Sequence, residues 1–227
     1  MGQPSVVSCL IQTCRDIHAT VLSRQKLPAN LLQLTFNVLT NISSSPECRA
    51  LVWKANLLEL FAASADRGQH PKRSKLQTSL LEYWLRLMLA LSFHTDGQLN
   101  ILKLRDIFDV LIELYSSKTF PKLVLDIIRN LCFHAPSKNR ISSCNPVVNI
   151  LLLNLGQKDK AVRMDCSIAV LSLLCNNQKA KVHLKGAGLG KCVQNTLDRL
   201  TLEGDVHSAD DMKYKRHLED VLQIMQG

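Results

Sequence analysis

A pattern of about 40 residues recurs four times in this 227-residue chain, and tandem repetition of that length leaves few folds open to it. In each copy a long amphipathic segment ends in a short signature, a short segment follows, and a strongly apolar segment comes last. The four signatures are Asn41–Ser44, Ala90–Phe93, Asn130–Phe133 and Leu173–Asn176, and their second residues are 49, 40 and 43 positions apart. A unit of this size cannot bury its apolar face alone, so we expect neighbouring units to stack.

Apolar residues have helical spacing along almost the whole chain. Near the N-terminus, Val7, Leu10, Ile11 and Cys14 occupy one face of a helix, whereas the strict alternation that indicates a strand is hard to find. We therefore predict an all-α chain that forms a single stack over residues 1–227. The expected parts are an N-terminal helix in 1–27, repeats in 28–202 with a polar loop inserted at 65–75, and a linker with a C-terminal capping helix in 203–227.

Composition and charge restrict the class of protein further. Hydrophobic residues make up 46% of the chain, which is enough to form a core and excludes a disordered protein. The net charge of +9 favours acidic partners. Eight cysteines without a Cys-x-x-Cys pair predict reduced thiols. We find no secretory signal or membrane-spanning stretch, so we expect a soluble, intracellular and cytoplasmic protein with no membrane insertion.

The repeat resembles the armadillo repeat. Asn130-Leu-Cys, the pair Asn139-Arg140 and the apolar run Pro146–Leu153 are similar to the end of the family's third helix, the start of its short first helix and its second helix. Lys185–Gly188 is similar to the glycine bend between the family's first two helices. The resemblance covers roughly residues 28–202, and it implies a right-handed armadillo-like solenoid of about four repeats that acts as a non-enzymatic protein-interaction scaffold.

A narrower resemblance concerns Leu173–Lys185 and the sequence around Asn130. Both are similar to the C-terminal region of a very large armadillo-like protein of centrioles and ciliary basal bodies. This implies a fragment or short isoform of a longer solenoid, with a role in centriole assembly and basal-body function and with centrosomal or ciliary protein partners. The alternatives are a soluble armadillo adaptor in nuclear transport or signalling, and a basic nucleic-acid-binding module, with nucleic acid the less favoured partner.

The long helices carry the candidate binding residues. In armadillo proteins the third helices line a concave groove, and residues four apart share a helix face. Counting back by four from each signature gives largely polar columns in the first three units, as an extended peptide groove requires. The alternative is an ordinary solvated face on which Lys122 and Asp126 form an i, i+4 pair. The candidate groove residues are Gln33, Asn37, Asn41, Glu82, Arg86, Lys122, Asp126 and Asn130.

The nuclear-import branch of the family has a tryptophan four residues before the signature asparagine. This chain has Asn37 and Asp126 at those positions, which disfavours import-type recognition of cargo.

A second candidate is the basic loop formed by Lys72, Arg73 and Lys75. It matches a minimal nuclear-import pattern, and it could equally contact an acidic partner, carry a regulatory phosphate at Ser74 or be a plain solvated loop. The sequence contains no Gly-x-Ser-x-Gly elbow and no zinc-finger spacing of Cys and His. We therefore expect no enzyme activity, catalytic residue, metal, cofactor or small-molecule substrate.

Overall fold

The computed structural model describes residues 5–28, 30–60, 62, 74–203 and 208–226, and all regular elements within those residues are helices. The chain forms two compact units, residues 1–124 and 125–227. The boundary between them lies within α8 (Pro121–Leu131). The prediction of an all-α chain is confirmed. No helix in the described residues is long and apolar enough to cross a membrane.

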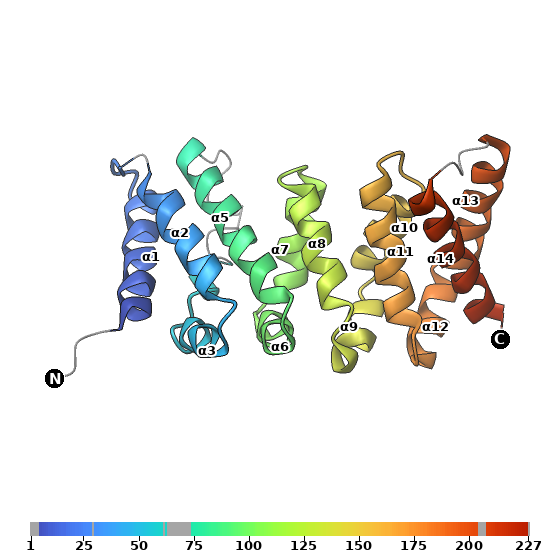
Figure 1. Cartoon of the computed structure of the whole chain (residues 1–227), viewed down its shortest axis with the longest axis horizontal. Coiled ribbons are helices and arrows are strands. Elements are labelled where there is room, and N and C mark those ends of the chain that lie inside the picture. The colour runs from blue at the N-terminus through green and yellow to red at the C-terminus, as the bar shows by residue number, and fades with distance from the viewer. Residues whose placement is uncertain (1–4, 29, 61, 63–73, 204–207, 227) are drawn as a thin grey trace. The chain divides into compact units, whose positions relative to one another are not determined.

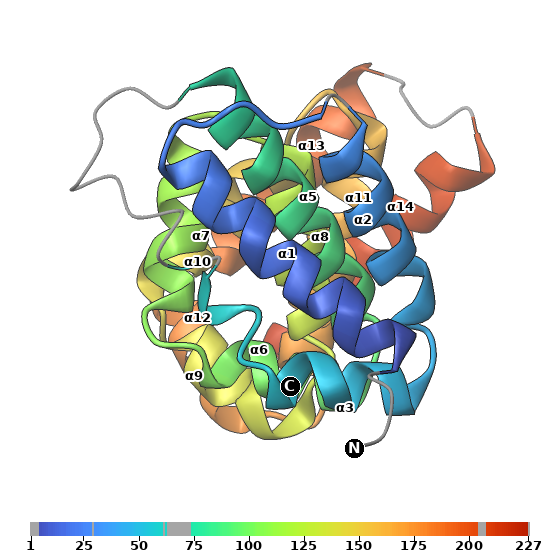
Figure 2. The ribbon, with the colours of Figure 1, turned by 90° about the vertical axis from the view of Figure 1, so that its left-hand side faces the viewer.

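The first unit has its long helices side by side and its short helices at one end of them (Figures 1 and 2). Helix α2 packs against both α1 and α5, and α6 packs against α5. The described helices of this unit are α1 (Val6–Leu22), α2 (Leu31–Ile42), α3 (Pro46–Lys54), α5 (Lys75–Ser92), α6 (Thr95–Lys103) and α7 (Ile107–Ser116).

Local capping residues explain where these helices begin. Ser5 and Ser45 each accept a hydrogen bond from a backbone N–H in the first turn of the helix that follows, and Pro46 occupies the first helical position of α3. Ser74 forms a reciprocal capping box with Gln77 at the start of α5. Of the residues predicted to form the inserted loop, 65–73 lie outside the described residues, whereas Ser74 and Lys75 are the cap and first residue of α5.

Aromatic packing joins α2 to α5 in the core of the first unit. The rings of Phe36 and Trp84 meet edge to face with their centroids 4.8 Å apart, and both side chains are fully buried. Such a pair contributes about 0.5–1.5 kcal/mol of stability beyond the contribution of the apolar area that it buries. Arg49 joins the short helices, since it donates to the backbone oxygens of Ser43 and Ser44 and forms an ion pair with Asp96 at 2.9 Å.

The second unit has two rows of long helices (Figure 1). Helix α11 packs against α10 and α14, α13 also packs against α10 and α14, and the short helix α12 packs against α9. Besides the shared α8, the elements are the 3-10 helix η1 (Ala135–Ser137), α9 (Lys138–Ser142), α10 (Asn145–Leu155), α11 (Lys160–Leu174), α12 (Gln178–Gly186), α13 (Leu189–Glu203) and α14 (Ala209–Gln226).

The helix ends agree with the repeat seen in the sequence. Each signature lies at the end of a long helix, because α2, α5, α8 and α11 end at Ile42, Ser92, Leu131 and Leu174. Gly188, in the expected glycine bend between α12 and α13, has a φ of 83°, which glycine adopts without steric cost. The extent of a single solenoid over residues 1–227 and its right-handed sense stay predictions.

Candidate protein-interaction surface

Helix α2 presents a column of uncharged polar side chains to solvent. Its sequence, LLQLTFNVLTNI, contains no Lys, Arg, Asp or Glu. Leu32, Phe36 and Leu39 point into the core and are buried. The predicted residues Gln33, Asn37 and Asn41 lie on the opposite face, are exposed, and form no side-chain hydrogen bond with any described residue.

Two apolar side chains are exposed next to this polar column. Leu34 is 61% exposed and Val38 is 43% exposed, and they lie one helical turn apart on α2. We call the surface formed by Gln33, Leu34, Asn37, Val38 and Asn41 the α2 face. It combines an apolar strip with carboxamides that can both donate and accept hydrogen bonds.

The second predicted column, on α5, is occupied by an internal ion pair. Arg86 donates to one carboxylate oxygen of Glu82 through Nε at 3.0 Å and through Nη2 at 2.7 Å. Arg86 is exposed and Glu82 is partly exposed, so the pair is an ordinary i, i+4 surface pair worth about 0.3–0.5 kcal/mol. A partner that used either charge would first have to compete with the other.

The third predicted column, on α8, is largely engaged within the protein. Asn130 is only 4% exposed, and its side-chain oxygen accepts hydrogen bonds from Nη2 and Nε of Arg129 at 3.0 and 3.2 Å. Arg129 also pairs with Asp165 at 2.5 Å and lies 3.9 Å from Asp126. Lys122, at the start of α8, is exposed.

The predicted basic loop falls mostly outside the described residues. Lys72 and Arg73 both lie there, whereas Lys75 is exposed at the first position of α5. A role of this loop in nuclear import or partner binding stays a prediction.

The C-terminal helix α14 is held by a buried polar cluster that sequence reasoning did not find. Ser208 caps α14, since its Oγ accepts from the backbone N–H of Asp211 at 3.2 Å. Asp211 lies in the first turn of α14 and is only 2% exposed. Its carboxylate accepts from Lys160 at 2.7 Å and from Arg163 at 2.8 Å.

The electrostatics of this cluster follow from its contacts. Hydrogen bonds from Lys160, Ser208 and Arg163 outweigh desolvation and hold the pKa of Asp211 well below its usual value. The guanidinium of Arg163 also lies 4.9 Å from the ring centroid of Tyr214. Burial raises the pKa of Tyr214, and its hydroxyl donates to the backbone oxygen of Leu155. The cluster therefore joins α10, α11 and α14.

Comparison with solved structures places the fold. An engineered protein matches with a TM-score of 0.62 and 15% identity over 98% of this chain and 97% of the other. A designed armadillo repeat protein, solved in complex with the peptide (KR)4, matches with a TM-score of 0.54 and 11% identity over 96% of this chain and all of the other. This chain has an armadillo-like repeat fold.

Sequence comparison finds two relatives, both called rotatin. Mouse rotatin is 28% identical over 231 residues, which cover 99% of this chain and 10% of rotatin. Human rotatin is 30% identical over 198 residues, which cover 85% of this chain and 9% of rotatin. The armadillo-like chain thus spans about a tenth of the length of the curated relatives it matches. No family model matches it.

Proposed function

We propose that this chain is a non-enzymatic protein-interaction scaffold whose α2 face binds an extended segment of a partner protein. The observation that carries the proposal is the pairing, on one charge-free helix, of three exposed carboxamides with the exposed Leu34 and Val38. Exposed side chains without partners in the described residues have no evident part in holding the unit together. They are therefore available to a ligand.

The spacing of the carboxamides suits an extended peptide. Residues four apart on a helix are separated by a rise of about 6 Å, and residues two apart in an extended chain by about 6.6 Å. Over a short segment, Gln33, Asn37 and Asn41 can therefore each face one residue of the peptide, at every second position along it. A carboxamide donates and accepts at once, so it can pair with both polar groups of a backbone without selecting a side chain.

The other two predicted columns are less available to a partner, because their side chains are already paired within the protein. Glu82 and Arg86 are already paired, and Asn130 is bound by Arg129. We infer that they shape the partner surface less than α2 does. Specificity would then come from Leu34 and Val38, which offer an apolar strip to the partner's side chains.

We further propose that the scaffold acts in centriole assembly and at the ciliary basal body, with centrosomal or ciliary proteins as partners. Support comes from the similarity to rotatin segments over 99% of this chain and from the centriolar resemblance of the residues around Asn130 and Leu173. Imaging of a tagged chain in dividing and ciliated cells tests this. Centrosomal foci are the expected result, and uniformly diffuse staining would contradict the proposed location.

A pull-down from ciliated cells tests the α2 face. The variant Asn37→Arg places a charge in the middle of the column, and Ser116→Arg, at an exposed position at the end of α7, is the matched control. We expect Asn37→Arg to lose partners that the wild type and Ser116→Arg both recover, with unchanged circular dichroism. Identical recovery by all three proteins would refute the role of α2.

A further inference from the structure

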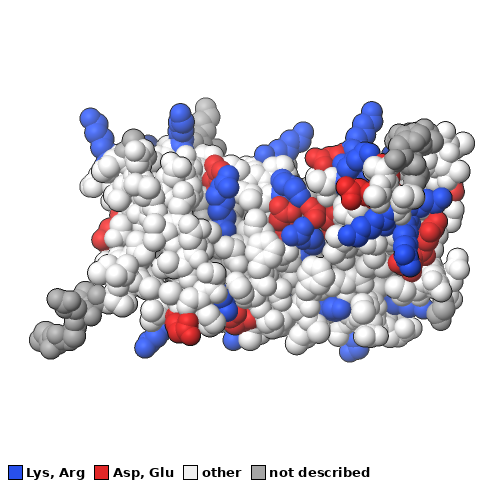
Figure 3. Space-filling view, in the orientation of Figure 1, with Lys and Arg blue, Asp and Glu red and all other residues white. Residues whose placement is uncertain are grey.

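Charges in the second unit are segregated. Several cations on α8, α11 and α14 have carboxylate partners, as in the pairs Arg129–Asp165, Arg163–Asp211 and Lys215–Glu219. The lysines of α12 and early α13 have no carboxylate partner among the described residues; they are Lys179, Lys181, Lys185 and Lys191. Residues 166–197 contain no Asp or Glu. Below α9 and α12, Figure 3 shows basic side chains and no acidic ones.

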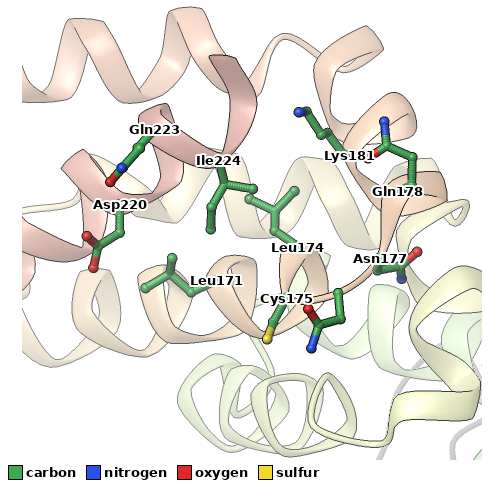
Figure 4. Close-up of a pocket in the computed structure, with 10 residues that line it drawn as sticks. Leu171, Leu174, Cys175, Asn177, Gln178, Lys181, Asp220, Gln223 and Ile224 are labelled. Atoms are coloured by element: carbon green, nitrogen blue, oxygen red, sulfur yellow. The ribbon is translucent and has the colours of Figure 1, made fainter. Parts of the chain in front are cut away.

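A cavity of about 760 Å³ lies against this basic segment, between the end of α11, the start of α12 and the second half of α14. Leu171, Leu174 and Ile224 form an apolar floor, and Figure 4 shows Leu174 and Ile224 facing each other. Lys181 and Asp220 lie on opposite sides of the opening (Figure 4). The cavity thus has an apolar centre and one basic wall.

A second, smaller cavity extends the site toward α9. It has a volume of about 250 Å³ and shares the turn Cys175–Asn177 with the first cavity. Lys138 and Asn139 line its other side, and Lys138 Nζ lies 3.3 Å from the backbone oxygen of Cys175. Amide and ammonium groups therefore border both cavities.

We propose that these two cavities and the α12 lysines bind an acidic peptide segment of a partner protein, with an apolar side chain on the Leu171–Leu174–Ile224 floor and flanking carboxylates on Lys181 and Lys185. Charge complementarity argues for this occupant, because the uncompensated lysines attract a carboxylate-rich chain. The inference rests on the proposed scaffold function for the kind of ligand, a protein segment, but it uses a different surface from the α2 face.

The surface fits other anions less well. Single-stranded nucleic acids are bound through aromatic stacking platforms, and residues 166–197 contain no Phe, Tyr or Trp. A bilayer surface would need protruding apolar side chains, whereas Leu171, Leu174 and Ile224 are recessed in the cavity and only Val182 of α12 is a large, strongly exposed apolar residue, at 63%. A peptide, in contrast, can insert one side chain into the cavity and contact the floor formed by Leu171, Leu174 and Ile224.

Fluorescence anisotropy with the full chain tests the proposal. The probe is a fluorescein-labelled peptide in which leucines are flanked by glutamates, and a peptide with lysines in place of the glutamates is the control ligand. We expect the acidic probe to bind, with an affinity that falls as NaCl is raised, and the basic peptide not to bind. Equal binding of the two peptides, or no binding of the acidic one at low salt, overturns the proposal.

Variants locate the site. Lys181→Glu should weaken binding of the acidic peptide by about tenfold, because it replaces an attraction by a repulsion. The matched control Lys158→Glu makes the same charge change at an exposed position near the other end of α11 and should leave affinity within about twofold. Equal losses in the two variants would show that only net charge matters and refute the site.

Two further measurements separate this site from competing explanations. Asn37→Arg, on the α2 face, should leave acidic-peptide binding unchanged, so failure of the α2 proposal and failure of this one give different results. Binding of duplex DNA or of phosphatidylserine vesicles in place of the acidic peptide, with a loss in Lys181→Glu, would assign the surface to that ligand and overturn the proposal.

Discussion

A single methyl group at Gly97 should destabilise the first unit, although it improves helix propensity. Gly97 is buried in α6, and a Cβ built there would lie 1.9 Å from the backbone oxygen of Leu91 and 2.7 Å from its carbonyl carbon. Real Cβ atoms do not come closer than 3.0 Å to such atoms. The end of α5 would therefore have to move away from α6 in Gly97→Ala.

The size of the effect follows from what that movement disturbs. Overpacking costs about 1–3 kcal/mol. The oxygen of Leu91 accepts from the backbone N–H of His94 at 3.1 Å, and Gln98 donates to the oxygen of Ser92 at 3.0 Å; weakening these bonds costs about 0.5–1.5 kcal/mol each. Replacing glycine by alanine within a helix returns only about 1 kcal/mol. We therefore expect a net loss of about 2–3 kcal/mol.

Urea denaturation followed by tryptophan fluorescence measures this loss, because both tryptophans, Trp53 and Trp84, lie in residues 1–124. Gly190→Ala is the matched control, since a Cβ at that helical position meets nothing within 4 Å. The control should leave the fluorescence midpoint unchanged or raise it slightly, whereas Gly97→Ala should lower it. A midpoint for Gly97→Ala equal to or above that of the wild type would refute the reasoning.

Three further predictions concern single sites. The ionised carboxylate of Asp211 stabilises the fold fully above about pH 4, where an unfolded aspartate titrates. This stabilisation is lost as the pH falls through the depressed pKa of Asp211 in the folded state. Acid titration followed by circular dichroism should therefore show a shallower loss of stability in Asp211→Asn than in the wild type. Glu82→Gln should change the unfolding free energy by less than about 1 kcal/mol in urea, and a larger loss would show that the pair is structural. With a thiol reagent, the exposed Cys9 and Cys175 should react first, whereas the buried Cys132, whose pKa burial raises, should react only on unfolding; early labelling of Cys132 would contradict its burial.

The fold could be predicted from the sequence because each repeat buries the same positions. The signature at the end of each long helix and the glycine bend at Gly188 both use short-range chemistry. Such chemistry is visible within a few residues. The exposure of Gln33, Asn37 and Asn41 follows for the same reason, because they lie opposite the apolar face of α2.

Long-range pairs account for what the sequence could not predict. Asn130 is buried next to Arg129, whose guanidinium reaches Asp165, 36 residues away. Asp211 meets Arg163 across 48 residues, so its burial has no local sequence signal. The cavity beside α12 depends on how α11 and α14 pack, and the lack of acidic residues in 166–197 is the one signal that could have pointed to it.

Selection of peptide ligands tests the central claim, a protein-binding α2 face, most directly. A library of random peptides is selected against the immobilised full chain, and each enriched peptide is then titrated against the wild type, Asn37→Arg and Ser116→Arg. The account predicts enriched peptides that bind the wild type and Ser116→Arg equally and lose at least about tenfold in affinity with Asn37→Arg. A selection in which no enriched peptide loses affinity with Asn37→Arg, or one that enriches no peptide, would contradict it.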